Sequence, residues 1–170
     1  MENAEKRVDI KDVSFTSTDG TSTIHARIWR PLGTFGERPR AIVQIVHGMS
    51  EHVRRYDEFA RYLCGRGYAV CGDDHIGHGA SAAPDKRGCM PARNGNEVLI
   101  DDEHALRALV SAEFPADTPY VFFGHSMGSF ITRCYLGRHG EGLAAAVICG
   151  TGTIPVVVSR AGHATARALA

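Results

Sequence analysis

Residues 121–130 of the chain read VFFGHSMGSF, and this stretch decides the fold. A short apolar run ends at Gly124, the pattern Gly-x-Ser-x-Gly surrounds Ser126, and the residues that follow have the composition of a helix. Glycines on both sides of Ser126 allow a very tight turn from a strand into a helix, which exposes the serine hydroxyl. The helix, expected over Met127 to Arg138, would point its free N–H groups at the same spot. An ordinary serine in a Gly-rich turn is the alternative interpretation.

Apolar strands and helices alternate on both sides of this turn. Residues 8–17 and 23–29 are expected to form a β-hairpin at an antiparallel edge of the sheet. The further strands are expected at 41–46, 68–71, 120–123 and 143–149, with helices near 56–63 and 96–114. This order predicts an α/β fold: a mostly parallel sheet with helices on both faces and an N-terminal antiparallel hairpin.

Three loops of unusual sequence leave strands at the same edge of that sheet. They begin at His47, Asp74 and Gly124, each directly after an expected strand. The carboxyl ends of parallel strands gather at one edge, and the sites of such folds lie there. The three loops are therefore predicted to converge on one site.

Ser126 has the surroundings of a nucleophile for acyl transfer. That reaction needs an activated hydroxyl, a general base and N–H donors for the developing oxyanion. The expected donors are the backbone N–H of Met127, directly after the serine, and that of Met49, in the loop after strand 41–46. Each such donor typically stabilises the transition state by about 3 kcal/mol. The alternative role of both methionines is to pack through their side chains.

Taken together, the three loops resemble those of a known family. The motifs HGMSEH at 47–52, DHIGHGAS at 74–81 and GHSMG at 124–128 occur in that order. From about residue 13 to residue 151 the chain is similar to the α/β hydrolases, in particular to their monoacylglycerol lipase and lysophospholipase-like branch. The resemblance implies a serine hydrolase that cleaves carboxylic esters of acyl lipids through an acyl-enzyme on Ser126. It implies a small acyl ester as substrate and neither a metal nor an organic cofactor.

The resemblance also gives supporting roles to residues around the nucleophile. These residues are His47 and Gly48 in the oxyanion loop, Asp74 and His78 in the second loop, and Gly124, His125 and Gly128 in the elbow. His75 and His78 could instead be metal ligands, because they are three residues apart. They lie in a Gly-rich loop without a second pair at ligand spacing, so no metal site is expected.

The acid and base of a catalytic triad are not found in this chain. In this fold they follow the serine, first Asp or Glu and then His. After Ser126 the chain has no aspartate, and its acidic and histidine residues are Glu141, His139 and His163. The first two are expected in a turn at the far edge of the sheet, out of reach of the serine.

His163 falls instead in a segment, 161–170, that resembles the start of a cap helix. We therefore expect residues 1–152 to be the N-terminal part of a hydrolase core and residues 153–170 to begin a cap or lid. Two other functions stay open. One is a non-catalytic truncated fragment or pseudoenzyme that binds an acyl ligand, and the other is a serine peptidase of the same fold.

Composition excludes several classes of partner. The 19 basic and 19 acidic residues cancel and form no basic block, so no nucleic-acid partner is expected. The start lacks the apolar core of a signal peptide, and no stretch is long enough to span a bilayer, which predicts a cytoplasmic protein without an integral membrane segment. The spacing of the five cysteines argues against disulfides or a zinc site, and Cys71, Cys134 and Cys149 are expected to be buried. Oligomeric state is left open.

Overall fold

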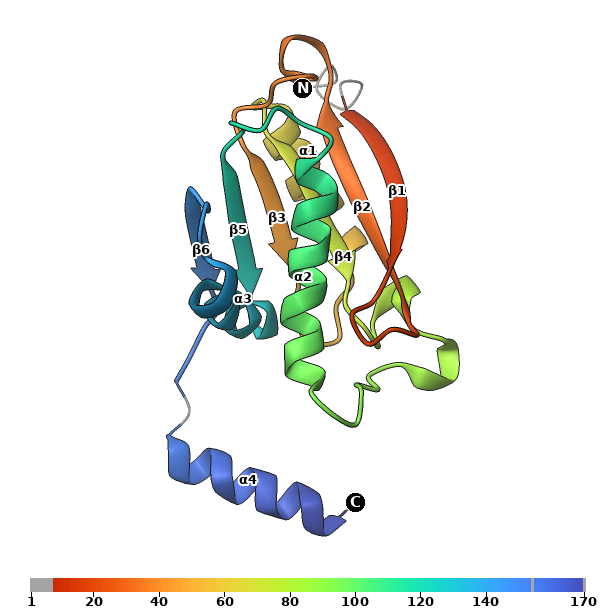
Figure 1. Ribbon diagram of the computed structural model, residues 1–170, viewed down its shortest axis with the longest axis vertical. Helices are drawn as coiled ribbons and strands as arrows, with labels where there is room; N and C mark the ends of the chain where they lie inside the picture. The colour runs from red at the N-terminus through yellow and green to blue at the C-terminus, as the bar shows by residue number, and fades with distance from the viewer. Residues whose placement is uncertain (1–7, 154, 170) are drawn as a thin grey trace.

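The computed structural model describes residues 8–153 and 155–169. Along the chain the elements are β1 (Val8–Thr16), β2 (Thr23–Pro31), β3 (Ile42–Val46), α1 (Asp57–Cys64), β4 (Ala69–Asp74), α2 (Gly95–Ser111), β5 (Tyr120–His125), α3 (Met127–His139), β6 (Ala145–Cys149) and α4 (Val156–Leu169) (Figure 1). Short 3-10 turns occur at Gly33–Phe35, Val53–Tyr56, Gly79–Ser81 and Pro84–Lys86. The order of strands and helices predicted from the sequence is confirmed.

The strands form one six-stranded sheet in the order β1-β2-β4-β3-β5-β6. β1 pairs with β2 and β2 with β4 in antiparallel fashion, and the pairs β4–β3, β3–β5 and β5–β6 are parallel. The predicted hairpin thus lies at one edge of a mostly parallel sheet. Because β3 lies between β4 and β5, the loops that follow these three strands emerge side by side.

Helices cover both faces of the sheet, as the apolar strands predicted. All five residues of β3 are buried, because alternate side chains enter opposite layers. Ile42 and Val46 pack in a cluster with residues of α2 and α3, whereas Val43 and Ile45 pack with Ala60 and Cys64 of α1. Burying a large apolar side chain of this kind stabilises the fold by about 1.5–3 kcal/mol.

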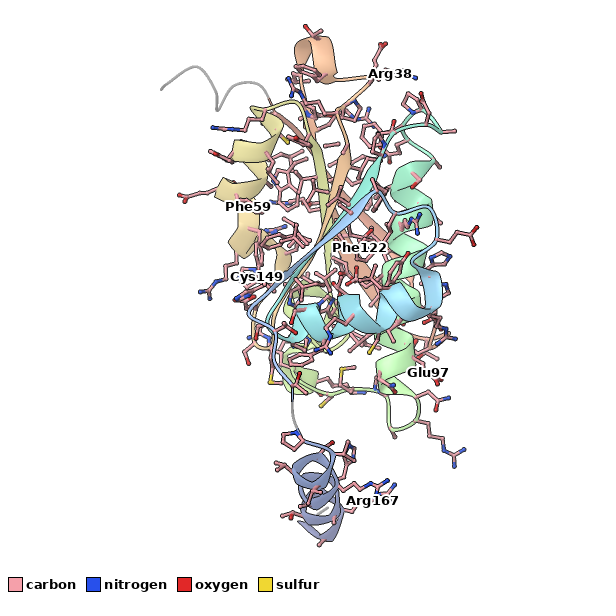
Figure 2. All side chains as sticks on the ribbon, turned by 90° about the vertical axis from the view of Figure 1, so that its left-hand side faces the viewer. Arg38, Phe59, Glu97, Phe122, Cys149 and Arg167 are labelled. Carbon is pink, nitrogen blue, oxygen red and sulfur yellow. The ribbon has the colours of Figure 1, made fainter. Side chains whose placement is uncertain are left out.

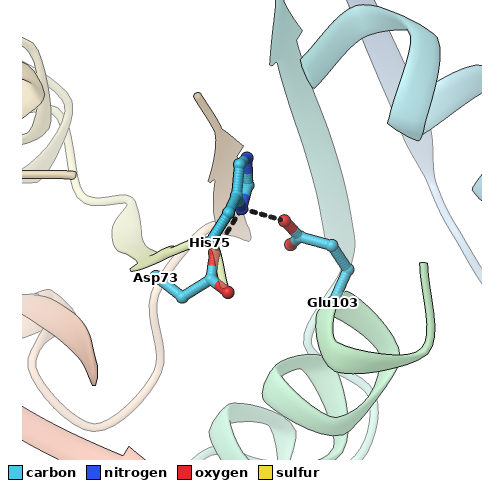
Figure 3. Close-up of side chains that lie close together, drawn as sticks. All are labelled: Asp73, His75 and Glu103. Carbon is cyan, nitrogen blue, oxygen red and sulfur yellow. Dashed lines mark ion pairs between the residues drawn. The ribbon is translucent and has the colours of Figure 1, made fainter. Parts of the chain in front are cut away.

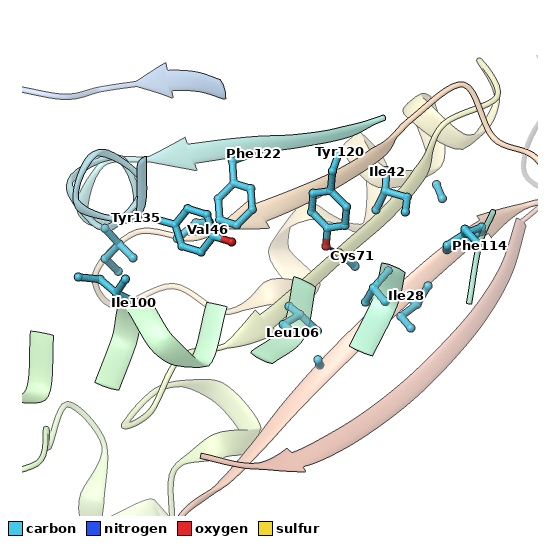
Figure 4. Packing of buried hydrophobic residues seen from close by; sticks show 14 residues of the cluster. Ile28, Ile42, Val46, Cys71, Ile100, Leu106, Phe114, Tyr120, Phe122 and Tyr135 are labelled. Atoms are coloured by element: carbon cyan, nitrogen blue, oxygen red, sulfur yellow. Dashed lines mark hydrogen bonds between the residues drawn. The ribbon is translucent and has the colours of Figure 1, made fainter. Parts of the chain in front are cut away.

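The larger cluster lies between the sheet and the two helices α2 and α3 (Figure 4). Phe122 of β5 and Tyr135 of α3 stack there with ring centroids 4.2 Å apart, and Leu106 of α2 is fully buried. Figure 2 shows the side chains filling the space on both sides of the strands, with Phe59 on the α1 side. This packing fixes α3, and with it the turn between β5 and α3.

The burial expected for two cysteines, one in α3 and one in β6, is not observed. Cys71 is buried as predicted, but Cys134 and Cys149 are exposed, so for these two the prediction is wrong. β6 is the last strand of the sheet, and its residues alternate between exposed and half-buried, with Val147 47% exposed. Within the described residues nothing packs over that face of β6.

α4 lies apart from the sheet and its helices (Figure 1). Every side chain from Val156 to Ala168 is exposed. The helices within residues 8–153 and 155–169 do not offer a continuous apolar length that would reach across a bilayer.

Candidate active site

Ser126 occupies the turn between β5 and α3. Its backbone has φ 51° and ψ −117°, a conformation with positive φ that residues with a side chain rarely adopt. The turn is held by the backbone on both sides: the N–H of Ser126 donates to the carbonyl of Cys149 at 2.9 Å, and the N–H of Ser129 donates to the carbonyl of Ser126 at 2.9 Å. The Ser129 hydroxyl also donates to this carbonyl, at 2.6 Å. Ser126 therefore stands at the N-terminus of a helix in a strained but well-supported turn.

The two elbow glycines are required by close packing. A Cβ on Gly128 would collide with the carbonyl oxygen of Val46 and lie 2.6 Å from that of His47. A Cβ on Gly124 would meet the Thr132 side chain and lie 2.6 Å from the carbonyl oxygen of Gly128. The helix can therefore start against the end of β3 only if both positions are glycine.

The oxyanion loop after β3 runs directly beside Ser126. A Cβ on Gly48 would lie 3.2 Å from the Cβ of Ser126, so the loop and the elbow are in contact. The next residue, Met49, is 68% exposed. The backbone N–H groups of Met49 and Met127 have no hydrogen-bond acceptor among the described residues. Of these two unpaired N–H groups, one thus follows Ser126 directly and the other follows Gly48, which contacts Ser126.

A carboxylate that the sequence did not single out fixes this loop. Glu51 Oε2 accepts hydrogen bonds from the N–H of Gly48 at 2.8 Å and from the Tyr56 hydroxyl at 2.8 Å. The same oxygen lies 3.4 Å from Nδ1 of His125, and the Tyr56 hydroxyl lies 3.1 Å from that nitrogen. Burial acts to raise the pKa of Glu51, but these hydrogen bonds outweigh it and lower the pKa. His125 is therefore turned toward Glu51 and Tyr56.

The second loop, which follows β4, is pinned by Asp74. Its carboxylate accepts hydrogen bonds from the N–H of Val53 and of Ala80, each at 2.7 Å. His78 is buried, and its Nδ1 lies 3.1 Å from the carbonyl oxygen of Ile76. Asp74 and His78, both predicted to support the site, thus line the cleft beside it.

A buried cluster lies behind these loops (Figure 3). Nδ1 of His75 lies 3.2 Å from Asp73 Oδ1 and 3.3 Å from Glu103 Oε1, and all three side chains are at most 1% exposed. Gln44 donates to the second oxygen of Glu103 at 2.5 Å. Burial, followed by the charge of Asp73, raises the pKa of Glu103 well above its usual range. Burial opposes the effect, but the charge of His75 lowers the pKa of Asp73, so the pKa values of the two carboxyl groups are shifted in opposite directions.

These three side chains also form the one group of donors in the described residues with the spacing of a metal site. Their ligand atoms lie within 4.8 Å of one another. The pair considered from the sequence, His75 and His78, is arranged differently, with ring centroids 6.0 Å apart at 78°. Any metal would therefore bind Asp73 and Glu103 with His75.

A cleft of about 950 Å³ opens between the first two loops and residues 87–90. The apolar part of its wall consists of Met49, Met90, Leu99 and Met127. Its polar part includes Glu51, His52, Arg54, Asp74, His78 and Arg87. Met127, the residue directly after Ser126, belongs to this wall.

Within the described residues the Ser126 hydroxyl makes no hydrogen bond to a histidine or a carboxylate, and the acidic and histidine residues that follow it lie elsewhere. His139 lies at the far end of α3, a helix of 13 residues, and its Nε2 is 3.0 Å from Asp101 Oδ1. At about 1.5 Å of rise per residue that end is nearly 20 Å from the elbow. Glu141 lies in the turn just beyond, and His163 lies on the exposed helix α4. In the described part of the chain, these later acidic and histidine residues are therefore not brought to Ser126 as a triad acid or base.

Sequence reasoning missed four residues of this neighbourhood: Glu51, Tyr56, Asp73 and Glu103. Glu51 lies inside the HGMSEH motif and could have been noticed as its one carboxylate. Glu103 interrupts the apolar face of α2, which is a signal for a buried polar partner. Tyr56 and Asp73 carry no comparable signal.

The mixed sheet, with the strained elbow after β5 and the loop after β3 beside it, is that of an α/β hydrolase. The chain belongs to the family described as serine aminopeptidase, S33, whose model matches residues 37–169.

Two of the curated relatives that the chain matches are named as lipases. Monoglyceride lipase of Mus musculus is 34% identical over 109 residues, covering 64% of this chain and 33% of that protein. Monoacylglycerol lipase of Mycolicibacterium smegmatis is 30% identical over 152 residues, covering 86% of this chain and 50% of that protein. The chain therefore spans a third to a half of the length of these relatives.

Solved structures agree with this family. A thermostable carboxyl esterase from Bacillus coagulans superposes with a TM-score of 0.79 at 39% identity, covering 88% of this chain and 47% of the esterase. A soluble variant of monoglyceride lipase from Saccharomyces cerevisiae has a TM-score of 0.66 at 20% identity, over 82% of this chain and 44% of the lipase. At that identity the second comparison shows the shared fold.

Proposed function

We propose that Ser126 is the nucleophile of a serine ester hydrolase that acts on monoacylglycerols, lysophospholipids or similar acyl esters. One observation carries the proposal: Ser126 is held at φ 51° at the start of α3, so close to Gly48 that a Cβ added to that glycine would lie 3.2 Å from the Ser126 Cβ. A strained serine at a helix N-terminus beside two free N–H groups is the arrangement that acyl transfer needs.

The reaction begins when the Ser126 hydroxyl attacks the ester carbonyl carbon; because no base is hydrogen-bonded to it in the described residues, its proton passes to solvent water. The N–H groups of Met49 and Met127 receive the negative charge that develops on the carbonyl oxygen. The alcohol leaves with a proton, and water then hydrolyses the acyl-enzyme and releases the fatty acid. The dipole of α3 favours the same negative charge.

The substrate class is proposed from the cleft and the relatives. The cleft offers four apolar side chains beside a polar part. The relatives and structures that are 30% or more identical include a monoglyceride lipase, a monoacylglycerol lipase and a carboxyl esterase. The description of the family as a serine aminopeptidase keeps peptide cleavage as a second candidate for the same nucleophile.

A non-catalytic role in binding acyl ligands is the other candidate, and the surroundings of Ser126 favour it. Among the described histidines, the ring of His125 is turned to Tyr56 and that of His139 to Asp101. Without a base, the oxyanion hole and binding alone give only residual acceleration. We therefore expect Ser126 of this 170-residue chain to react slowly.

A fluorophosphonate probe tests the nucleophile. We expect slow, stoichiometric labelling of the purified chain that disappears in Ser126→Ala and persists in Ser111→Ala, a control at the end of α2. Labelling that survives Ser126→Ala would refute the assignment. Hydrolysis of monoacylglycerol in preference to an amino-acid amide would favour the lipase over the peptidase.

We further propose that residues 1–152 form the hydrolase core and that residues 153–170 begin a cap over the cleft. Val156, Val157 and Val158 are 65%, 79% and 60% exposed, an apolar surface of the kind that contacts lipid or substrate. A variant that ends at residue 152 should keep the cooperative unfolding of the sheet. Loss of that transition would contradict the boundary.

A further inference from the structure

Two arginines line the cleft beside the proposed nucleophile, and the reaction described above uses neither of them. Arg54 lies in the 3-10 turn that precedes α1, and Arg87 directly follows the last of the short 3-10 turns. Both belong to the polar part of the cleft wall, and both are exposed. Met127, which follows Ser126, belongs to the apolar part of the same wall. A ligand held by these arginines would therefore lie in the cleft that borders Ser126.

Arg54 is available to bind a ligand. Its guanidinium lies 3.4 Å from Asp12 Oδ2, and 62% and 56% of the two side chains are exposed. Asp12 already accepts two shorter hydrogen bonds from Arg27, at 2.6 and 2.8 Å. An exposed ion pair such as that of Arg54 contributes little to stability. Arg54 can therefore turn toward a ligand without leaving Asp12 unpaired.

Arg87 also has no competing partner, since it makes no hydrogen bond or ion pair with another residue that the structure describes. Its backbone is nevertheless held in place. The N–H of the next residue, Gly88, donates to the carbonyl of Gly77 at 2.7 Å, and a Cβ added to Gly77 would collide with the carbonyl of Cys89. The guanidinium of Arg87 is thus carried by a segment that packs against the loop after β4.

The segment that carries Arg54 is joined to the same loop. Asp74, at the end of β4, accepts a hydrogen bond from the N–H of Val53, the residue before Arg54. The carboxylate of Asp74 also accepts the N–H of Ala80, at the end of the loop. One short loop thus connects the two segments, and both arginines line the cleft beside it.

The carboxylates in the cleft wall are less accessible and have partners of their own. Asp74 is 5% exposed, and its two oxygens accept the hydrogen bonds just described. The side chain of Glu51 is 13% exposed; one of its oxygens is bound by Gly48 and Tyr56, and the other lies 3.6 Å from Nε of Arg55. Their negative charge is compensated locally, so the exposed formal charge in the cleft is that of the two arginines.

A phosphate group fits this exposed positive charge. A guanidinium presents its N–H donors in a planar fork that can bind two phosphate oxygens at once. The head of a monoacylglycerol offers hydroxyl groups and no charge to the same side chains. The four apolar side chains of the wall favour a ligand that also carries a hydrocarbon chain over a small free phosphate ester.

We propose that Arg54 and Arg87 bind the phosphate of an anionic head group, so that the cleft takes lysophospholipid-type acyl esters in preference to neutral monoacylglycerols. The role rests on the proposed function, because it names the substrate class of the same nucleophile. The two arginines bind the head group and take no part in the bond changes at the ester.

Binding of ether lipids to the full chain tests this preference without any cleavage. 1-O-decylglycerol 3-phosphate and 1-O-decylglycerol have the same chain and glycerol unit, differ by the phosphate, and contain no ester bond. Below their micelle-forming concentrations, calorimetric titration should show at least about tenfold tighter binding of the phosphate, because hydrogen bonds between charged groups are strong. Glycerol 3-phosphate, which lacks the chain, should bind more weakly. Equally tight binding of glycerol 3-phosphate would overturn the proposal in favour of a site for free phosphate esters.

The variant Arg54→Gln/Arg87→Gln should bind the two ether lipids with similar affinity. Arg66→Gln is the matched control, because Arg66 is also exposed but lies over the ring of Tyr62, outside the cleft. It removes one positive charge and should keep the preference. Equal binding of both lipids to the wild type, or an unchanged preference in the double variant, would overturn the proposal. So would a loss of the preference in Arg66→Gln, which would indicate a response to net charge alone.

Protection of Ser126 links the phosphate to the proposed nucleophile. 1-O-decylglycerol 3-phosphate should slow fluorophosphonate labelling of Ser126 in the wild type, and the double variant should need at least about tenfold more ligand for the same protection. Tight binding without protection would place the phosphate away from the nucleophile and refute its role as the head group of the substrate. If Ser126 is not labelled even without ligand, the nucleophile proposal fails, and the calorimetric comparison still decides whether the two arginines hold a phosphate.

Discussion

Replacing Ser126 with glycine should make the protein more stable while removing its proposed nucleophile. A residue with a side chain at φ 51° and ψ −117° carries a strain of about 1–3 kcal/mol, which glycine does not. Glycine is more flexible in the unfolded chain, and this costs about 0.5–1 kcal/mol. Ser126 makes no side-chain hydrogen bond at the start of α3, so no cap is lost. The net expectation is a stabilisation of roughly 1 kcal/mol.

Urea unfolding followed by circular dichroism measures this difference. For a chain of this size, 1 kcal/mol corresponds to about 2–4 °C in melting temperature, which gives a second readout. Ser126→Ala keeps the Cβ and should stay within about 0.5 kcal/mol of the wild type, since surface-like changes without lost contacts are small. Ser129→Gly, inside the helix, should be less stable.

A Ser126→Gly protein that unfolds at lower urea than Ser126→Ala would refute the reasoning. It would mean that the turn is not strained by the Cβ of residue 126. If both variants were equally stabilised, the hydroxyl and not the backbone would be the unfavourable group.

Three further predictions follow from the packing and the buried charges. Gly128→Ala should destabilise the protein by at least about 2 kcal/mol, because the new Cβ would meet the Val46 carbonyl. Gly137→Ala, at a position of the same helix with open space around it, should stabilise the protein by about 0.5–1 kcal/mol. Urea titrations compare the two variants. The folded-state pKa of His75 is raised to about 9, so the stability that it contributes is complete below pH 6.5 and is lost as pH rises toward 9; the pH dependence of unfolding should weaken in His75→Gln. In a thiol-reagent assay, the exposed residues Cys89, Cys134 and Cys149 should react in the folded protein. The buried residues Cys64 and Cys71 should react only after unfolding; burial also raises the pKa of the Cys64 thiol to about 12. Rapid reaction of all five cysteines would contradict the described core.

Most of the fold could be predicted because its signals are local. The apolar run of β3 and the glycines around Ser126 each specify their own structure, and the topology then brings the loops to one edge. The error at Cys134 and Cys149 has a different origin. Periodicity shows which residues share a face, but it does not show whether another element covers that face.

The parts of the site that were missed depend on partners far away in the sequence. Glu103 is buried because it meets His75 and Gln44, and nothing near Glu103 in the chain specifies either contact. Glu51 similarly acquires its role from Gly48, Tyr56 and His125, of which only the last belongs to the elbow. Motifs identified the loops, whereas the hydrogen bonds that position them required coordinates.

The bond from the Ser126 amide to the Cys149 carbonyl continues the β5–β6 ladder one step beyond the pairing of His125 with Cys149. The elbow is thus anchored to an edge strand. The amide proton of Ser126 can exchange with solvent deuterium only when the end of β6 separates from β5. Exchange at this single amide therefore reports how often the edge of the sheet opens, and a ligand that clamps β6 would slow it without contacting the cleft.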